Sequence, residues 1–390
     1  MNKKVLIFTS TTGHLSLAKA IYDILKKNNW RPELVDLIND QSGFSQNSKI
    51  FYKSFYLYFP FLFKIPFKFS QKEFLQKEIK KFLIKTYQRR IEEKIKQVCP
   101  DLVIATHFAY NAPLTNIPNR KIPFLNVVAD PLSFHRLETE SQADFNFIYD
   151  KQTIGMCQKL GVPKEKIKVS GWFVQSRFYN TSPDKRLLKI LNFNPNVITV
   201  LICGGSEGAN AILKILPILL ITKKPLQIIV ICGDNTTLFK ALNSFKKTFA
   251  KIPTVLSKNN IKLKIIQKTT KMADFMALAD LVIGKAGPNL LFETVASGKP
   301  FFAICHISGQ EDGNLEIIKK KKLGFVEENP FGAIKLLQKI IENPKSLHRF
   351  QKEVIKERHR IQQAEKILMG TIKSLHLPSS RQNSKNIKTK

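Results

Sequence analysis

Residues Leu281–Asn314 read LVIGKAGPNLLFETVASGKPFFAICHISGQEDGN, and this stretch decides the fold. The apolar run 281–283 predicts a strand that breaks at Gly284 and again at Gly287-Pro288, followed by a helix from about Asn289 to Ser297. A strand, a glycine-containing turn and a helix in succession direct free backbone N–H groups and the positive end of the helix dipole at one spot. That spot suits a phosphate group.

The residues around this turn include side chains that can hydrogen-bond a ribose and a sugar. Glu293 lies one helical turn after Asn289 and so on the same side of the helix, where its carboxylate can accept hydrogen bonds from the two hydroxyls of a ribose. A short apolar strand at 300–304 is followed by a polar loop, Gly309-Gln310-Glu311-Asp312-Gly313-Asn314, whose side chains can bond sugar hydroxyls. Together these contacts predict a nucleotide-sugar site.

These residues also carry a family resemblance. Lys285-Ala286-Gly287-Pro288, then Glu293, then Gly309-Gln310-Glu311 with Gly313-Asn314 resembles the donor-site signature of the lipid-directed GT-B glycosyltransferases. That branch includes monogalactosyldiacylglycerol synthases and bacterial processive diacylglycerol glucosyltransferases, and it is related to the enzyme that adds N-acetylglucosamine to lipid I. The looser match runs from about Lys4 to Gly324, and Asn289 stands where the family usually has a small residue. The resemblance implies an α/β GT-B fold: two Rossmann-like doubly wound domains facing an interdomain cleft.

The pattern of strand, glycine turn and helix occurs twice, which predicts the domain organisation. It begins at Lys4–Thr9 and restarts at Val197–Cys203, with the polar, proline-bounded stretch Tyr179–Pro195 as a linker. We therefore expect an N-terminal acceptor- and membrane-binding Rossmann-like domain at 1–175 and a nucleotide-sugar-binding Rossmann-like domain at 196–345. A C-terminal helix at 346–376 should pack back toward the first domain, and 377–390 has so little to bury that we expect disorder.

Two residues are candidates for the catalytic base. His14 follows Gly13 in the first glycine turn, and Asp130 lies at the carboxyl end of the predicted strand 123–129, where ligands bind in open α/β sheets. The related enzymes carry a Gly-His pair at the first turn, usually behind further glycines, and the resemblance implies acceptor-side roles for Gly13, Asp130 and His135. Histidine suits neutral pH, whereas an aspartate needs its pKa raised by desolvation; the sequence does not choose between them.

The donor half of the reaction must stabilise a leaving diphosphate. A helix N-terminus flanked by glycines can do this without a bound cation. The chain has no clustered carboxylate pair like the metal-holding motif of the other large glycosyltransferase fold. We therefore expect no metal and no cofactor beyond the UDP-sugar co-substrate. The predicted donor-binding residues are Gly204, Gly205, Ser206, Gly208, Gly287, Pro288, Asn289, Glu293, Gln310, Glu311 and Asn314.

The charge balance and one aromatic segment indicate a membrane surface. The 390 residues include 63 Lys and Arg against 30 Asp and Glu, a net charge of +33, part of which can be compositional bias. Residues 51–97 mix aromatic with basic side chains, a mixture that suits the interface of an anionic membrane; the anchors we expect are Phe55, Tyr56, Phe59 and Phe61. The alternative is a pair of amphipathic helices packed on the domain's own sheet. No zinc spacing, RNP-like strand or helix-turn-helix pattern indicates nucleic acid.

The sequence thus predicts transfer of a hexose from a UDP-sugar to a lipid acceptor, most simply the hydroxyl of diacylglycerol, with the inversion that the resemblance implies. The alternatives are an N-acetylglucosaminyl-type transferase acting on a polyprenyl-linked sugar, a non-catalytic GT-B scaffold, and a nucleic-acid-binding protein. No signal peptide is recognisable, no apolar run approaches the roughly 20 residues of a membrane span, and the five scattered cysteines suit a reducing compartment. We expect a cytoplasmic protein, peripheral on the inner face of the cell membrane.

Overall fold

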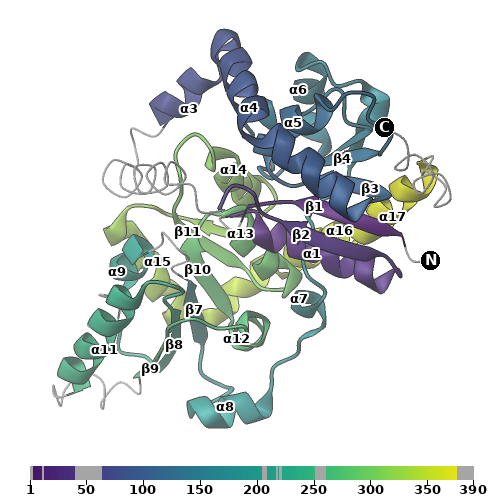
Figure 1. The fold of residues 1–390 in the computed structure, drawn as a ribbon. Helices are drawn as coiled ribbons and strands as arrows, with labels where there is room; N and C mark the ends of the chain where they lie inside the picture. Colours follow the sequence, from purple (N-terminus) through teal and green to yellow (C-terminus); the bar gives the residue numbers. More distant parts are fainter. Residues whose placement is uncertain are drawn as a thin grey trace. The chain divides into compact units, whose positions relative to one another are not determined.

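The structure is a computed structural model, and it describes residues 3–10, 13–39, 64–203, 209–216, 218, 222–250 and 261–375. The chain divides into two compact units (Figure 1). Unit 1 comprises Met1–Gln175, Ser308–Gln310 and Arg360–Lys390, and unit 2 comprises Ser176–Ile307 and Glu311–His359.

Unit 1 is built on a six-stranded parallel sheet of order β2-β1-β3-β4-β5-β6. The strands are short and largely buried, because helical crossovers between parallel strands cover a sheet of this kind. After β1 the chain adds β2 on one side and then crosses to β3 on the other, so the strand order reverses between β1 and β3. The strands are β1 (Lys4–Phe8), β2 (Arg31–Val35), β3 (Leu102–Ala105), β4 (Phe124–Val127), β5 (Phe145–Ile148) and β6 (Ile167–Val169).

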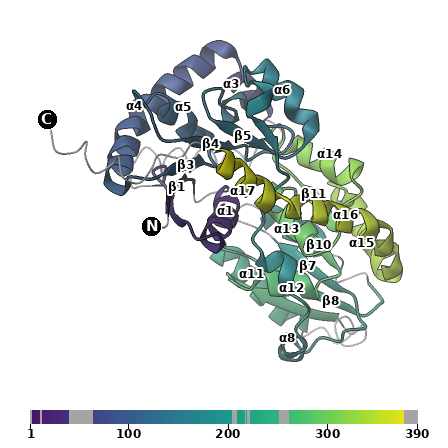
Figure 2. The same cartoon turned by 90° about the vertical axis from the view of Figure 1, so that its right-hand side faces the viewer.

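The helices of unit 1 are α1 (Leu15–Lys27), α3 (Lys64–Ser70), α4 (Glu73–Val98), α5 (Asn111–Thr115), α6 (Ile154–Lys159) and α17 (Ala364–Ser374). The second half of α4 packs Tyr87, Ile91 and Ile95 against the core of the sheet, as the packing alternative for residues 51–97 proposes. The first half leaves aromatic side chains exposed. Figure 2 shows α17 beside α1, where Lys27 Nζ lies 2.9 Å from Glu365 Oε1.

Unit 2 repeats the architecture, with a six-stranded parallel sheet of order β12-β11-β10-β7-β8-β9 that reverses between β7 and β10. The strands are β7 (Thr199–Cys203), β8 (Leu226–Ile231), β9 (Ile261–Ile266), β10 (Leu281–Lys285), β11 (Phe301–Cys305) and β12 (Gly324–Val326). The helices are α7 (Arg177–Asn180), α8 (Lys185–Leu191), α9 (Ala209–Ile215), α11 (Thr236–Ala250), α12 (Met272–Leu278), α13 (Pro288–Ala296), α14 (Asp312–Lys320), α15 (Pro330–Glu342) and α16 (Gln351–Gln362). Two doubly wound parallel sheets confirm the predicted fold class.

The structure corrects the sequence prediction at two places in the deciding stretch. Strand β10 does not break at Gly284 but continues to Lys285. A Cβ on Gly284 would lie 2.9 Å from the Cys203 carbonyl oxygen, so the glycine allows close approach of β7 rather than a turn. The polar loop is also shorter than expected, because α14 already begins at Asp312.

The C-terminal region is not one helix over 346–376. It consists of a 3-10 helix (Pro344–Phe350), α16 and α17, with a break at Gln363. The residues that group with unit 1 begin at Arg360. The stretch Tyr179–Pro195, expected as a linker with a short helix, contains α8 and groups with unit 2. The expected disordered tail, 377–390, lies outside the described residues.

Candidate active site

Two histidines meet at the point in unit 1 where the strand order reverses. His14 follows β1 at the start of α1, and His107 follows β3. Their ring centroids are 4.5 Å apart in an edge-to-face arrangement. Ligands of doubly wound sheets bind beyond the carboxyl ends of the strands at such a point, so the topology places His14 where the sequence predicts a catalytic group.

His14 is held neutral at physiological pH. Burial lowers its pKa from 6.5 to about 4, although a hydrogen bond to the Thr106 carbonyl raises it. Within the described chain, His14 Nδ1 is buried without a hydrogen-bond partner. His107 Nδ1 accepts the Ala109 N–H at 3.1 Å, and burial and the neighbouring His14 lower the pKa of His107. A neutral imidazole with a nitrogen lone pair, beside a second neutral imidazole, can accept a proton.

The second candidate base, Asp130, follows β4 and is buried. Its carboxyl lies within reach of a side-chain hydrogen bond to that of Glu138, another buried residue. His135 is also engaged. Its Nδ1 accepts the Leu137 N–H at 3.2 Å, and its Nε2 lies 3.0 Å from Ser70 Oγ on α3. His135 therefore links the loop after β4 to α3.

The donor-side turn lies in unit 2 after β10, next to the strand-order reversal at β7. Gly287 caps α13 and Pro288 is its first residue, an arrangement that suits Pro because its missing N–H would be unpaired there. Asn289 and Glu293 follow on the helix, and Glu293 is partly exposed. The other predicted phosphate loop, Gly204, Gly205, Ser206 and Gly208, lies outside the described residues.

Two polar residues after β11, Glu311 and Asn314, contact the donor-side turn. Glu311 is 4% exposed; its Oε1 lies 2.5 Å from Lys285 Nζ and its Oε2 accepts the Ile307 N–H at 2.7 Å. Asn314 Nδ2 donates to the Ala286 carbonyl at 2.7 Å. The loop that bears Glu311 and Asn314 is thus tied to the donor-side turn at 285–287. Gln310 falls in the segment that groups with unit 1.

Two carboxylates contact His306, the residue that follows β11. His306 Nδ1 lies 2.7 Å from Glu328 Oε1, and its Nε2 lies 3.1 Å from Asp312 Oδ1. Burial lowers the pKa of His306, but the hydrogen bonds and charges of Glu328 and Asp312 outweigh burial and raise that pKa above 6.5.

The sequence does not single out Glu138. Lys285 belongs to the segment that carries the family resemblance, and His107, at the end of the predicted strand 101–106, is expected on the same rim as His14 and Asp130, but the sequence assigns neither residue a role. Lys285 and His107 each stand at the end of a strand, a signal that was visible in the sequence. Glu138 lies three residues after His135, and nothing in the sequence distinguishes it from a solvated glutamate. The predicted membrane anchors Phe55, Tyr56, Phe59 and Phe61 lie outside the described residues.

Comparison with known proteins gives two family matches that lie one after the other along the chain. Residues 14–174 match monogalactosyldiacylglycerol (MGDG) synthase, and residues 199–369 match the glycosyltransferase family 28 C-terminal domain. The first match contains His14 and Asp130, and the second contains the donor-side turn.

Individual proteins give similar matches. The chain is 23% identical to processive diacylglycerol beta-glucosyltransferase of Bacillus subtilis, over 98% of each chain. It is 27% identical to monogalactosyldiacylglycerol synthase 3 of Arabidopsis thaliana, over 88% of this chain and 75% of that protein. Among solved structures, MurG of Acinetobacter baumannii superposes with a TM-score of 0.58 at 16% identity, over 96% of this chain and 100% of that chain. This likeness shows the GT-B fold.

Proposed function

Because the chain belongs to the GT-B glycosyltransferases that join an MGDG synthase domain to a family 28 C-terminal domain, we propose that it transfers a hexose from a UDP-sugar to a lipid hydroxyl, that of diacylglycerol. The relatives whose names specify diacylglycerol support this acceptor. The observation that carries the proposal is the neutral His14 at the strand-order reversal of the MGDG synthase domain.

In this proposal His14 is the general base. As the acceptor oxygen attacks the anomeric carbon, its proton passes to the neutral imidazole. The bond from that carbon to the β-phosphate oxygen breaks with inversion, and UDP leaves with the electron pair. A hydrogen bond from the ring to the Thr106 carbonyl stabilises the imidazolium that forms. Asp130 is the weaker candidate because its carboxyl already faces that of Glu138 and accepts from Gln310 Nε2 at 3.0 Å.

The donor site in unit 2 binds the leaving diphosphate at the N-terminus of α13, which Gly287 caps and Pro288 begins, because the positive end of the helix dipole favours an anion there. Glu293 is placed one turn later for the ribose. Beside this turn, the ion pair of Lys285 and Glu311 holds both side chains in place. The site chemistry requires no cation, and we propose a metal-independent reaction.

The proposal extends to an anionic membrane surface, through the face formed by α3 and the first half of α4. Ile65, Phe69, Phe74 and Phe82 are exposed there. Lys68, Lys72 and Lys77 are interspersed and exposed, and Lys72 Nζ lies 4.7 Å from the centre of the Phe69 ring. Apolar rings among lysines suit lipid headgroups, and each lysine near such a surface contributes about 1 kcal/mol. None of the helices in the described ranges has the length and apolarity of a membrane-spanning segment.

The test is turnover of radiolabelled UDP-glucose, UDP-galactose and UDP-N-acetylglucosamine with vesicles containing diacylglycerol, in EDTA. We expect a labelled glycolipid with diacylglycerol. His14→Ala should lower kcat by about 10²- to 10⁴-fold, whereas His359→Ala, an exposed histidine on α16, should not. Product formed only with a polyprenyl-diphosphate-linked sugar would favour the alternative acceptor. UDP binding without turnover on any lipid would favour a non-catalytic scaffold.

The membrane face is tested separately by vesicle co-sedimentation. Phe69→Ser with Phe74→Ser should reduce binding to anionic vesicles, since the two side chains are 50% and 59% exposed. The matched control is Phe331→Ser on α15 of unit 2, a phenylalanine that is 83% exposed but outside the proposed face. Equal loss with both variants would show that general apolar exposure, and not this face, binds the vesicles.

A further inference from the structure

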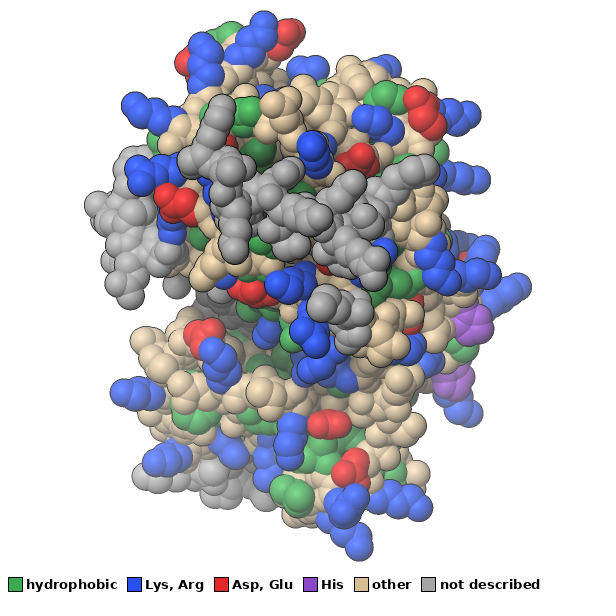
Figure 3. Space-filling model, turned by 45° about the vertical axis from the view of Figure 1, so that its right-hand side comes forward, with side chains coloured by type: hydrophobic (Ala, Val, Ile, Leu, Met, Phe, Trp, Pro, Cys, Tyr) green, Lys and Arg blue, Asp and Glu red, His purple; other side chains and the backbone are tan. Residues whose placement is uncertain are grey.

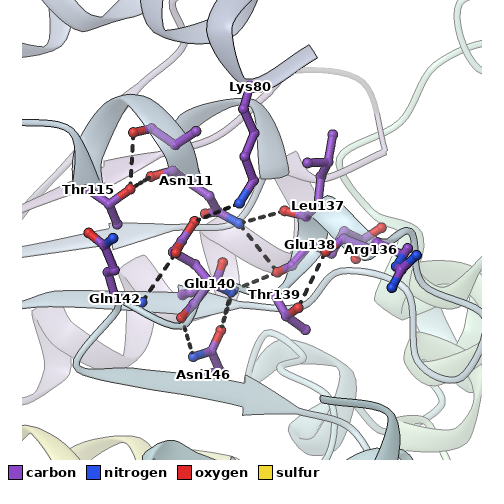
Figure 4. Close-up of polar contacts among 12 residues, drawn as sticks. Lys80, Asn111, Thr115, Arg136, Leu137, Glu138, Thr139, Glu140, Gln142 and Asn146 are labelled. Atoms are coloured by element: carbon purple, nitrogen blue, oxygen red, sulfur yellow. Dashed lines mark hydrogen bonds and ion pairs between the residues drawn. The ribbon is translucent and has the colours of Figure 1, made fainter. Parts of the chain in front are cut away.

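The loop after β4 carries a buried glutamate whose backbone is pinned from two elements. Asn111 Nδ2 from α5 donates to the Leu137 carbonyl at 3.1 Å and to the Glu138 carbonyl at 3.4 Å (Figure 4). Asn126 Nδ2 from β4 donates to the same Glu138 carbonyl at 2.6 Å. Both asparagines are buried. The backbone at Glu138 is therefore held in place independently of the contacts that its side chain makes.

The side chain of Glu138 meets the turn that bears Asp130. Glu138 is 5% exposed, and its Oε2 accepts the N–H groups of Ala129 and Asp130, each at 3.1 Å. These bonds bring the Glu138 carboxyl up to that of Asp130, within reach of a side-chain hydrogen bond between the two. Carboxylates are acceptors only, so such a bond requires a proton on one of the two groups.

The environment favours keeping that proton. Burial, and next the charge of Asp130, raise the pKa of Glu138 well above its usual value, and the two backbone N–H bonds only partly oppose them. Two buried carboxyl groups in contact resist double ionisation. The groups that face Glu138 from α5 and β4, Asn111 and Asn126, are neutral.

The neighbouring Glu140 shows the contrast. It is equally buried, at 5% exposed, yet its Oε2 lies 3.8 Å from Lys80 Nζ on α4, and its Oε1 accepts the Gln142 N–H at 3.2 Å (Figure 4). In the same loop, one buried glutamate thus faces a lysine and the other faces a carboxyl group.

We propose that Glu138 is a positioning residue for Asp130, with the two carboxyl groups sharing one proton and carrying a single negative charge between them. This rests on the proposed function and on the acceptor-side role that the family resemblance implies for Asp130. The shared proton and the two N–H bonds hold the Asp130 carboxyl in one orientation at the end of β4. The proton stays in the pair during transfer, because His14 receives the acceptor proton. When the pair loses its proton at high pH, the two carboxylates repel each other and the turn at 129–130 loosens.

The first test is the pH profile of kcat/KM for three proteins: wild type, Glu138→Gln and the control Glu140→Gln. Glutamine at 138 can still accept the two N–H bonds and can donate its amide to Asp130, but it adds no second charge. We expect the alkaline limb of the wild type to move up by roughly one pH unit or more in Glu138→Gln, the scale of a like-charge effect. It should not move in Glu140→Gln. If Glu138→Gln lowers kcat/KM by the same factor at every pH and the alkaline limb does not move, Glu138 has a merely structural role and the proposal is overturned.

A second test does not depend on turnover and so separates this proposal from the proposed function. At neutral pH the infrared spectrum of the wild type should contain the C=O band of a buried protonated carboxyl, and titration to high pH should remove it. Glu138→Gln should lack the band, because a neutral amide at 138 leaves the Asp130 carboxyl ionised, and Glu140→Gln should retain it. If the band is absent from the wild type, or persists in Glu138→Gln, the shared proton is refuted whether or not the protein transfers sugar.

Discussion

Replacing Lys285 by methionine tests whether Glu311 is a buried anchor or a free sugar ligand. The Glu311 side chain is 5% exposed and that of Lys285 19%, with 2.5 Å between Oε1 and Nζ. Methionine keeps most of the lysine volume and removes the charge. Glu311 cannot simply turn toward water, because its Oε2 accepts the Ile307 N–H at 2.7 Å.

The expected cost follows from this burial. Removing one partner of a buried ion pair leaves an uncompensated charge and lowers the free energy of unfolding by about 3–5 kcal/mol. Glu311→Gln keeps an acceptor for the Ile307 N–H and leaves Lys285 near solvent, so we expect a smaller loss of about 1–3 kcal/mol. In the double variant neither charge remains, and the two losses should fall short of additivity by about 1–3 kcal/mol.

Urea unfolding followed by circular dichroism measures these losses. A chain of two units need not unfold in one step, so the midpoint of the transition is compared at constant m-value. The control is Lys320→Met, which breaks the exposed pair of Lys320 and Glu316 on α14 and should cost less than about 1 kcal/mol. If Lys285→Met costs no more than this control, Glu311 is not held by the pair, and its side chain is available as a donor ligand.

Three further predictions concern unit 2. Gly324→Ala should prevent stable folding, seen as loss of the cooperative transition, because a Cβ at φ +152° would lie 1.8 Å from the Phe301 carbonyl oxygen. His306 has a raised pKa, so its contribution to stability is complete below pH 6.5 and is lost as pH rises through the folded-state pKa; in thermal melts His306→Gln should remove this pH dependence, and an unchanged dependence would contradict the assignment. Glu293→Ala should weaken UDP binding in calorimetry by about tenfold, the effect of one lost charged hydrogen bond, whereas Glu316→Ala should leave it unchanged.

The sequence predicted the sheets better at their centres than at their edges. Apolar runs identified strands such as β1, β7 and β11, because a parallel strand covered on both faces is apolar along its length. Two strands were not predicted: β2, whose sequence RPELV contains Pro32 and Glu33, and the three-residue β12. Both lie at the edges of their sheets, where proline and charge are tolerated and the apolar signal disappears.

The same limit applies to the site. Glycine turns after strands located the residues at both strand-order reversals, because that placement follows from the order of the elements alone. The partners of Glu311 and Glu138 could not be predicted, since each pairing depends on how side chains pack. Glu311 sits beside a lysine, and Glu138 beside an aspartate. Two glutamates thus have opposite electrostatic surroundings, and the sequence does not indicate which of them lies beside a positive charge and which beside a negative one.

The net charge alone does not specify a membrane site either. Lys and Arg side chains spread over the face shown in Figure 3 rather than gathering in one cluster, so that face offers a diffuse field to any polyanion. What distinguishes α3 and the first half of α4 is the combination of exposed Phe69 and Phe74 with neighbouring lysines. Salt screens the lysines and leaves ring burial intact. Vesicle binding by this face should therefore weaken with added salt but not vanish, whereas binding by charge alone should vanish.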